Sequence, residues 1–447
     1  MSDITAQRST TGGDPLLDEL RTWLEENWDP DLTVAEWWER LGLAGWSHPT
    51  LPENAYGKGL SRNDGVRVQQ TIGEFGALGA PGGLGLLLAA PTIAAHGTQE
   101  QIDLYVRDIV TGQKAWCQLF SEPGAGSDLA GLTCKGEQDG DEWIFNGQKV
   151  WTSGGQVADM GMLISRTNAE VPKHQGITYF ALDMHQAGVD IRPLREMTGR
   201  AMFNEVFLSD ARCHNDALLG GLNNGWAVAN TTLMHERAGL GAGGGSGGGG
   251  AATPGTVAGQ LNRKAGDFAP AGGGGAARRS GGGGGGGGRS GGHSMYAQFA
   301  RSRGLIDDPT IRQDLALMYT LNEVGKFNNL RAKAARAVGQ DIPGLANIAK
   351  LSMSNIVRLN RDLGLRIMGP FGTLHAYTPD QAKELNEATG NPYLGMITES
   401  ALYAQAPPIY GGTDQIQKNI IGERVLGLPK EPSNDRVVPF KELPKNG

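Results

Sequence analysis

A stretch of 52 residues, 241–292, contains 25 of the 70 glycines in this chain of 447 residues. Glycine loses more backbone freedom on folding than any other residue and has no side chain to pack, so this stretch is a poor candidate for a packed core. It has no Gly-X-Y period, which excludes a collagen-like helix. We interpret it as a flexible insertion on the surface, including its non-glycine island TPGTVAGQLNRKAGDFAPA; the alternative is a mobile flap over a nearby site.

The remaining composition excludes several classes of protein. Cys117, Cys134 and Cys213 are odd in number and form no CxxC pair, so we expect neither a disulfide framework nor a metal site, and a reducing, cytoplasmic setting fits. A net charge of -7 argues against a dedicated nucleic-acid binder. The N-terminus has no apolar leader, and the most apolar run, 82–95, is too short to span a bilayer. We therefore expect a soluble, cytoplasmic protein without a membrane span.

Hydrophobic periodicity predicts that the chain begins with helices. Within residues 14–115, Leu16, Leu20, Leu24 and Trp28 recur four residues apart and form one apolar stripe. The segment HGTQEQ further along marks a junction between two helices, where its threonine is a predicted N-cap. The first block is therefore predicted to be entirely helical.

Short β-rich runs follow, and helical character then returns. EWIFNGQKVWT and GITYFALDM are such runs, and the sequences DGDEW and FNGQK predict hairpins because Asp-Gly and Asn-Gly supply positive φ. Beyond Gly225 the helical pattern resumes on both sides of the glycine-rich stretch. The predicted class is α+β and mostly helical. The predicted domains are a helical domain at 1–115, a middle β domain at 116–220, a helical domain at 221–435 that contains the insertion 241–292, and a tail at 436–447.

The segment SEPGAGSD, residues 121–128, is the sharpest local motif. Its glycines let a loop approach a ligand closely, Ser121 and Ser127 offer hydroxyl groups, and successive N–H groups can cradle a phosphate. An ordinary turn is the alternative, because glycine and serine are common in turns. The segment lacks the lysine of a P-loop and does not match GxGxxG, so it gives little support to a nucleoside-triphosphate or Rossmann site.

Two further segments also combine glycines with hydroxyl side chains. In NGQKVWTSGG, Trp151 can stack on a planar cofactor while Thr152 and Ser153 bond its edge, although an isolated tryptophan is more often a core residue. In IYGGTDQIQ, two glycines precede Thr413, which we expect to cap the N-terminus of a helix. Taken alone, such a cap has only a structural role.

Together these segments resemble the acyl-CoA dehydrogenase family over residues 75–240 and 295–430. The resemblance includes HGTQEQ, SEPGAGSD, KVWTSGG, MTGRAMFNEVFL, MGPFG and YGGTDQIQKNIIGERVLG, in the order of that family. It implies helices, then a β-barrel, then a four-helix bundle. It also implies an FAD enzyme that oxidises an acyl-CoA thioester to the trans-2-enoyl-CoA. In that reaction a carboxylate removes the α proton and hydride passes from the β carbon to flavin N5.

The catalytic carboxylate departs from the commonest pattern of the family. Where many members have a glutamate after the tyrosine of their YEGT motif, this chain has Gly411, which cannot abstract a proton but keeps its N–H for the enolate oxygen. The resemblance to the isovaleryl-CoA and long-chain enzymes implies Glu236 as the base instead. The alternative for Glu236 is a solvated helix glutamate. The glycines that follow predict that its helix ends within a turn or two, which puts the insertion beside the active site.

The resemblance also implies the residues that contact FAD. Most lie in the motifs quoted above, and the arginine at the pyrophosphate is either Arg303, which we favour, or Arg301. The implied contacts are Gln118, Phe120, Ser121, Ser127, Trp151, Ser153, Arg303, Gly369, Gly372, Thr413 and Gln415.

Partners follow from the same resemblance. Flavin sites in this family borrow residues from a neighbouring subunit, which implies a dimer or tetramer of one chain or a mixed assembly. Electrons would leave through an electron-transfer flavoprotein. The main alternative is a non-catalytic or half-site partner subunit of a heteromeric acyl-CoA dehydrogenase, and an oxidase or flavin monooxygenase is a further one. The acyl chain stays open among fatty, branched and sterol-side-chain thioesters.

Overall fold

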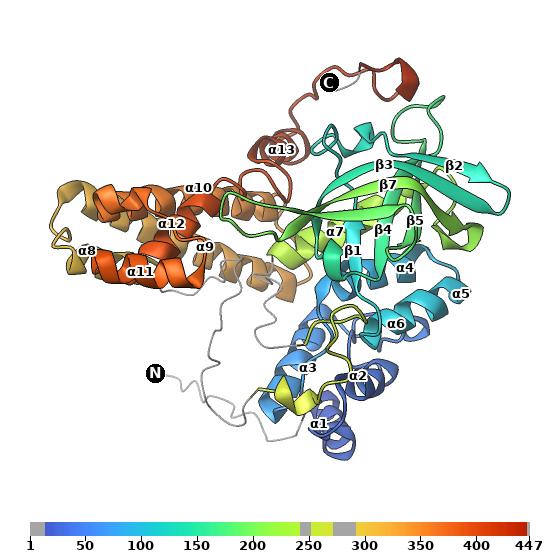
Figure 1. Ribbon diagram of the computed structural model, residues 1–447, viewed down its shortest axis with the longest axis horizontal. Coiled ribbons are helices and arrows are strands. Elements are labelled where there is room, and N and C mark those ends of the chain that lie inside the picture. Colours follow the sequence, from blue (N-terminus) through green and yellow to red (C-terminus); the bar gives the residue numbers. More distant parts are fainter. Residues whose placement is uncertain (1–13, 242–251, 271–291, 445–447) are drawn as a thin grey trace, which may run out of the picture.

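The computed structural model describes residues 14–241, 252–270 and 292–444 of the chain. Figure 1 shows a group of helices at the N-terminal end, a sheet packed against them, and an elongated group of helices that extends to one side. The predicted order of a helical block, a β block and a second helical block is confirmed.

The N-terminal helices bury the apolar stripe that the sequence predicts. Leu20 and Leu24 are fully buried, and Leu16 and Trp28 pack against the same cluster. Thr98 accepts a hydrogen bond from a backbone N–H of the following turn, so the predicted N-cap is confirmed. The helical segments of this part are α1 (Pro15–Asn27), α2 (Val34–Leu43), α3 (Arg62–Phe75), the π-helical η2 (Gly85–Ala89), α4 (Ala90–His96), α5 (Gln99–Gln101), the π-helical η3 (Ile102–Val106) and α6 (Arg107–Val110).

The middle part is one mixed sheet of eight strands in the order β6-β7-β3-β2-β4-β5-β8, with β1 paired in parallel to β4. A barrel closes only when its outermost strands pair with each other. Within the described residues, β6 pairs with β7 and β8 pairs with β5, so the sheet is open and the expected β-barrel is not confirmed. The strands are β1 (Trp116–Leu119), β2 (Lys135–Asp139), β3 (Glu142–Ser153), β4 (Met160–Arg166), β5 (Ile177–Asp183), β6 (Val189–Leu194), β7 (Phe203–His214) and β8 (Leu218–Leu219).

One of the two predicted hairpins is confirmed and the other is wrong. Gly140 has a φ of 62° and lies at the turn between β2 and β3, as DGDEW predicts. Asn146 and Gly147 instead lie inside β3, where the pairing with β7 shifts register after Phe145. A Cβ at Gly147 would lie 2.8 Å from the Cys134 Cα, so glycine is needed there for a close approach within the sheet.

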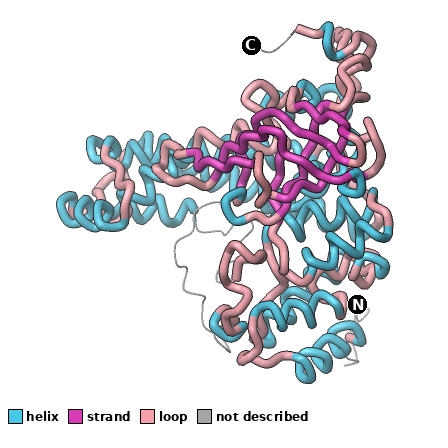
Figure 2. The backbone as a smooth tube through the Cα atoms, turned by 45° about the vertical axis from the view of Figure 1, so that its right-hand side comes forward, coloured by secondary structure: helices cyan, strands magenta, loops and turns pink. Residues whose placement is uncertain are grey.

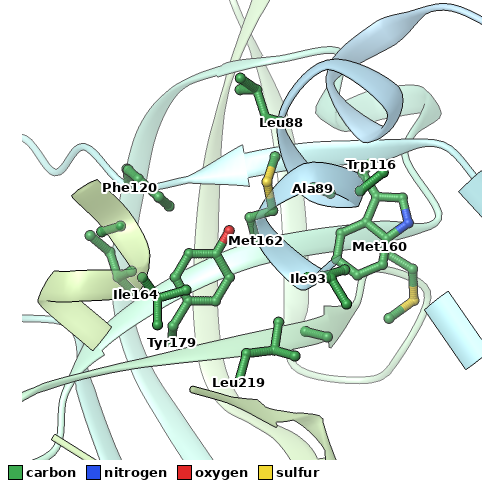
Figure 3. Packing of buried hydrophobic residues seen from close by; sticks show 14 of the residues in the cluster. Leu88, Ala89, Ile93, Trp116, Phe120, Met160, Met162, Ile164, Tyr179 and Leu219 are labelled. Carbon is green, nitrogen blue, oxygen red and sulfur yellow. The ribbon is translucent and has the colours of Figure 1, made fainter. Parts of the chain in front are cut away.

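The largest buried cluster joins the N-terminal helices to the sheet. Figure 3 shows Leu88 of η2 and Ile93 of α4 lying near Trp116 of β1 and Tyr179 of β5. All four side chains are buried. These helices therefore cover one face of the sheet and fix the end of β1.

The tip of the β6–β7 pair reaches the C-terminal helices. Figures 1 and 2 show this pair extending from the sheet toward the elongated helical group. Arg200 forms an ion pair with Glu399 of α12 (Leu394–Tyr403), and His375 Nε2 lies 3.3 Å from the Thr198 carbonyl oxygen. The segment MTGRAMF thus connects the middle part to the last.

The C-terminal helices divide between two places. α7 (Gly225–Gly241) carries Glu236 and packs mainly against β5, η2 and α4. The remaining helices are α8 (Gly292–Ser302), α9 (Pro309–Ala337), α10 (Leu345–Met368), α11 (Pro379–Thr389), α12 and α13 (Asp414–Ile420). α7 also contacts α10 of the elongated group. The helices α8 to α12 share a core that includes Phe299, Met318 and Ile367. The helix of Glu236 was predicted to end within a turn or two of that residue; α7 is described as far as Gly241, and residues 242–251 lie outside the described residues.

Residues 252–270, here called the clip, are the described part of the glycine-rich insertion. The clip lies along α2, where the Ala35 N–H donates to the Leu261 carbonyl at 3.0 Å. Leu261 and Ala265 are buried in the cluster of the N-terminal helices. The expected flexible surface insertion is therefore wrong for these residues, because their apolar side chains join a core.

The clip also reaches the sheet. The Gly255 N–H donates to the Gly112 carbonyl at 2.8 Å, and the Thr256 hydroxyl donates to the buried Asp159 carboxylate just before β4. Asp159 also accepts from the Ala115 N–H at 2.8 Å. The clip therefore bridges the N-terminal helices and the start of β4.

We expect Leu261→Ala to lower the free energy of unfolding by about 2–5 kcal/mol, because truncating a buried leucine to alanine loses apolar burial and leaves a cavity. The free energy of unfolding in urea measures the effect. Val257→Ala is the control, since Val257 of the same segment is 46% exposed. Equal stabilities of the two variants would contradict the packing of the clip.

Candidate functional site

The predicted cofactor residues begin at the end of β1. Gln118 is half-buried, whereas Phe120 is buried and meets Tyr179 edge-to-face with ring centroids 5.9 Å apart. The Phe120 side chain therefore belongs to the core of Figure 3. The Ser121 carbonyl accepts from the Val150 N–H at 2.9 Å, which holds this strand end beside β3.

Two buried charges join the same strands and were not among the predicted site residues. Lys149 Nζ lies 2.9 Å from Glu122 Oε1, and the two side chains are 0% and 5% exposed. Burial alone raises the pKa of the Glu122 carboxyl, but the Lys149 ammonium and hydrogen bonds from Thr133 and Cys134 hold that pKa below its ordinary value. The signal in the sequence was a lysine inside a β-rich run, two residues before Trp151.

Trp151 has the geometry of a binding residue rather than that of a core residue. Its side chain is 58% exposed, and its φ of 62° lies in the left-handed region that non-glycine residues rarely adopt. The indole lies edge-on to the Phe203 ring at 5.8 Å, and Ser153 pairs with Phe203 at the end of β3. An exposed and braced aromatic ring beside a hydroxyl group fits a planar ligand with a hydrogen-bonding edge, as the flavin of FAD is.

Glu236 is half-buried on α7, and hydroxyl contacts fix that helix. Thr232, one turn earlier, has its Oγ1 3.0 Å from Thr92 Oγ1 and 3.3 Å from the Tyr179 hydroxyl oxygen. Tyr179 is the ring that meets Phe120. A short series of contacts thus connects the helix of Glu236 to the strand end at Phe120.

Two histidines near this helix are neutral at neutral pH. Burial, together with the neighbouring His235, lowers the pKa of His48 to about 4. Burial also lowers the pKa of His235, the residue directly before Glu236. Neither imidazole therefore supplies a positive charge that would stabilise an ionised carboxylate on this turn.

The turn at Gly411 and Gly412 precedes α13. Their φ values of 62° and 81° are both left-handed, which glycine adopts without strain. Thr413 accepts from the Ile416 N–H, so the predicted cap is confirmed. Within the part of the chain that the structure describes, the Gly411 N–H donates to no partner and is available to a ligand.

Two residues that the sequence reasoning passed over hold this turn. Gln417 Nε2 donates to the Gly411 carbonyl at 3.0 Å, whereas the predicted contact Gln415 is exposed. Asp414 is 6% exposed and is joined to Lys350 and Arg358 of α10. The signal available in the sequence was Asp414 itself, an acidic residue at the start of a predicted helix.

The remaining predicted residues lie on the C-terminal helices. The Arg303 guanidinium, just after α8, lies 5.3 Å from the centroid of the Phe371 ring. Gly369 and Gly372 flank that phenylalanine, and Gly369 has a φ of 57°. The structure therefore brings these three predicted residues together around one ring.

Ser127 is exposed on a loop that the C-terminal tail partly covers. Lys173 Nζ lies 2.9 Å from Asp128 of this loop and 2.6 Å from Asp435 of the tail. A hollow of about 580 Å³ lies between loop and tail, lined by these three residues and by Phe440 among others.

Comparison with known families matches the chain in three consecutive segments. "Acyl-CoA dehydrogenase, N-terminal domain" matches residues 15–113, the middle domain of the same family matches 117–211, and its C-terminal domain matches 295–426. Acyl-CoA dehydrogenase IpdE1 of Mycobacterium tuberculosis is 34% identical over 395 residues, which cover 88% of each chain.

Two solved structures are similar in fold. The ChsE4–ChsE5 complex from Mycobacterium tuberculosis has a TM-score of 0.62 at 24% identity, over 95% of this chain and 100% of that one. The Tcur3481–Tcur3483 steroid ACAD has a TM-score of 0.63 at 24% identity, over 93% of this chain and 97% of that one. Across the described ranges, no helix combines the length and the apolar character that crossing a membrane requires.

We expect Asp414→Asn to destabilise the protein by about 1–3 kcal/mol at pH 7, because it removes the anion shared by Lys350 and Arg358. Burial raises the pKa of Asp414, but hydrogen bonds from Ser354 and Lys350 hold it below its ordinary value. This stabilisation is therefore present above about pH 4 and is lost as the pH falls further.

Urea unfolding at pH 7 and at pH 3 tests this expectation. The difference between wild type and Asp414→Asn should shrink at pH 3. The control is Asp362→Asn, because the Asp362 side chain is 54% exposed in its ion pair. A difference that does not depend on pH would refute the role of the ionised carboxylate.

Proposed function

The chain belongs to the acyl-CoA dehydrogenase family, and we propose that it oxidises an acyl-CoA thioester to the trans-2-enoyl-CoA with Glu236 as the general base. Members of this family are flavin-dependent oxidoreductases, and the cofactor is FAD. The observation that carries the proposal is the contact series from Phe120 through Tyr179 to Thr232, because it ties the helix of the base to the strand beside the cofactor.

FAD, when bound, accepts the hydride that leaves the β carbon. In the proposed site the exposed indole of Trp151 would lie beside the bound flavin, and the Ser153 hydroxyl and the main chain of Phe120 and Ser121 would hold its polar edge. These groups lie on adjacent ends of β1 and β3, which supports the assignment. The other proposed contacts are Gln118, Ser127, Arg303, Gly369, Gly372, Thr413 and Gln415.

Proton removal needs two aids from the protein. The α proton of a thioester is weakly acidic, so the base must be held in place and the carbonyl oxygen must meet a hydrogen-bond donor as its charge develops. The buried Thr232 contacts support a fixed Glu236, whose carboxylate takes the proton. The Gly411 N–H is proposed as the donor to the thioester oxygen.

We propose a bulky acyl group as the substrate class. Gly411 has no side chain where many family members carry glutamate, and this leaves room beside the thioester. A steroid ACAD is among the structures that share the fold, which supports the same class. A panel of fatty, branched and sterol-side-chain thioesters, followed by flavin reduction, ranks the candidates.

Glu236→Gln should keep bound FAD and lose the bleaching of the flavin by acyl-CoA under anaerobic conditions. A positioned base contributes about 10²–10⁴-fold in rate, and the amide cannot take a proton. Stopped-flow absorbance measures the rate. Glu384→Gln, at an exposed position on α11, is the matched control. Undiminished bleaching in Glu236→Gln would contradict the assignment of Glu236 as the general base.

A half-site subunit of a heteromeric acyl-CoA dehydrogenase is the second candidate. α9 exposes an apolar strip, and exposed strips of this kind mark contacts with other proteins. Its members are Leu317, Val324, Phe327 and Leu330, each at least 48% exposed. The ChsE4–ChsE5 structure of the same fold is a complex, which supports a second chain. We propose that another subunit covers this strip and that electrons leave through an electron-transfer flavoprotein.

Purification of the chain alone separates the two candidates. We expect flavin absorption bands and, by light scattering, at least twice the chain mass of 47.2 kDa. Phe327→Asp should lower that mass, because a charge cannot be buried unpaired, whereas Leu43→Asp on α2 should not. Flavin bands that appear only after a second chain is added would favour the half-site subunit.

A further inference from the structure

The buried ion pair of Glu122 and Lys149 has no part in the reaction steps above. Removing two charges from water is costly, and a buried salt bridge is often no more stabilising than well-packed apolar residues. We propose that these two are positioning residues, which hold the end of β1 and an irregular turn of β3 in the relative placement that FAD requires. The proposal rests on the proposed binding of FAD beside Trp151 and Ser153.

Lys149 joins three segments through one ammonium group. Its Nζ donates to the Phe120 carbonyl at 3.1 Å, to Glu122 Oε1 at 2.9 Å and to the Ile164 carbonyl at 2.9 Å. These acceptors lie at the end of β1, on the SEPGAGSD loop and on β4. An ammonium has three N–H donors, so all are used and any rotation leaves a buried donor unpaired. The Phe120 carbonyl is therefore fixed relative to β3.

Glu122 fixes the loop from the other side. Its carboxylate accepts from the Thr133 N–H at 2.7 Å, the Thr133 hydroxyl at 2.8 Å and the Cys134 N–H at 2.9 Å. Its main chain exchanges two hydrogen bonds of 3.0 Å with Ala125, which close the first turn of the loop. The carboxylate has no free oxygen, so the pair is specific to this arrangement of strands.

Lys149 also anchors the irregular part of β3. The pairing of β3 with β7 shifts register between Lys149 and Thr152, and Trp151 lies in this bulge with its left-handed backbone. A β-bulge re-aims the side chains around it, and such strain persists only where the surroundings hold it. Val150 bonds Ser121 within the same turn. The buried ammonium thus fixes the residue from which the bulge starts.

The test replaces both charges together. Glu122→Gln with Lys149→Met keeps the side chains close to their original size and leaves no unpaired buried charge, whereas either single variant leaves one. The matched control is Glu137→Gln with Lys135→Met, which removes an ion pair of 2.8 Å on β2 whose side chains are 55% and 61% exposed. Both variants are made in the full chain and are compared as holoenzymes for FAD binding and flavin reduction, and without FAD for amide hydrogen exchange.

In the Glu122/Lys149 double variant, we expect a Tm within about 4 °C of wild type. FAD affinity should fall at least about 10-fold, and flavin reduction should slow on the order of 100-fold with KM for acyl-CoA unchanged, because a misplacement near 1 Å has that effect. The visible bands of the bound flavin should shift. Wild-type affinity and spectrum in this variant would overturn the proposal.

Amide hydrogen exchange on the chain without FAD keeps this test separate from the proposed reaction. Exchange should quicken at residues 118–123 and 148–154 in the double variant and stay unchanged in the control. Unchanged exchange in these segments overturns the positioning role, whether or not Glu236 is the base. The Glu236→Gln experiment addresses the reaction alone, because it leaves FAD binding in place.

Discussion

The packing of η2 and α4 on the sheet face formed by β1, β4 and β5 is the contact on which the rest of the structure depends (Figure 3). It buries apolar surface from both layers and so fixes the end of β1. It also supports α7, since Thr232 touches both Thr92 of α4 and Tyr179 of β5. The proposed base and the proposed flavin strand therefore rest on one buried layer, which explains how residues far apart in sequence keep a fixed relation.

Directional contacts complete what this apolar packing cannot specify. Apolar burial is proportional to area and has no preferred direction, whereas a buried charge must meet its partners at defined places. Lys149 bonds its partners between three strands, and Asp414 bonds its partners at the turn before α13. Asp159 accepts hydrogen bonds where the clip meets β4. Each of these residues lies at a junction between segments that the apolar core leaves free to slide. Two of the proposed site residues, Trp151 and Gly411, lie within three residues of Lys149 and Asp414 in the chain.

Local signals predicted two helix caps correctly. The caps at Thr98 and Thr413 need only residues three positions away, so both were visible in the sequence. The sequence could not decide whether Trp151 is a core residue or a binding residue, because its left-handed backbone and its exposure arise from a register shift with β7. Gln417 was missed because only the folded turn shows which glutamine reaches back to the glycine carbonyls. The other site residues that the resemblance implies remain proposals.

The order of helices, sheet and helices was determined by the sequence alone, because hydrophobic periodicity is a property of neighbouring residues. The open edge of the sheet, the packing of the clip and the pair of Glu122 and Lys149 were decided only by the tertiary structure. Each of them depends on residues that are distant in the chain: Leu261 meets α2, and β8 meets β5 without reaching β6. No local pattern specifies such pairings, since they form only when the apolar core has brought the segments together.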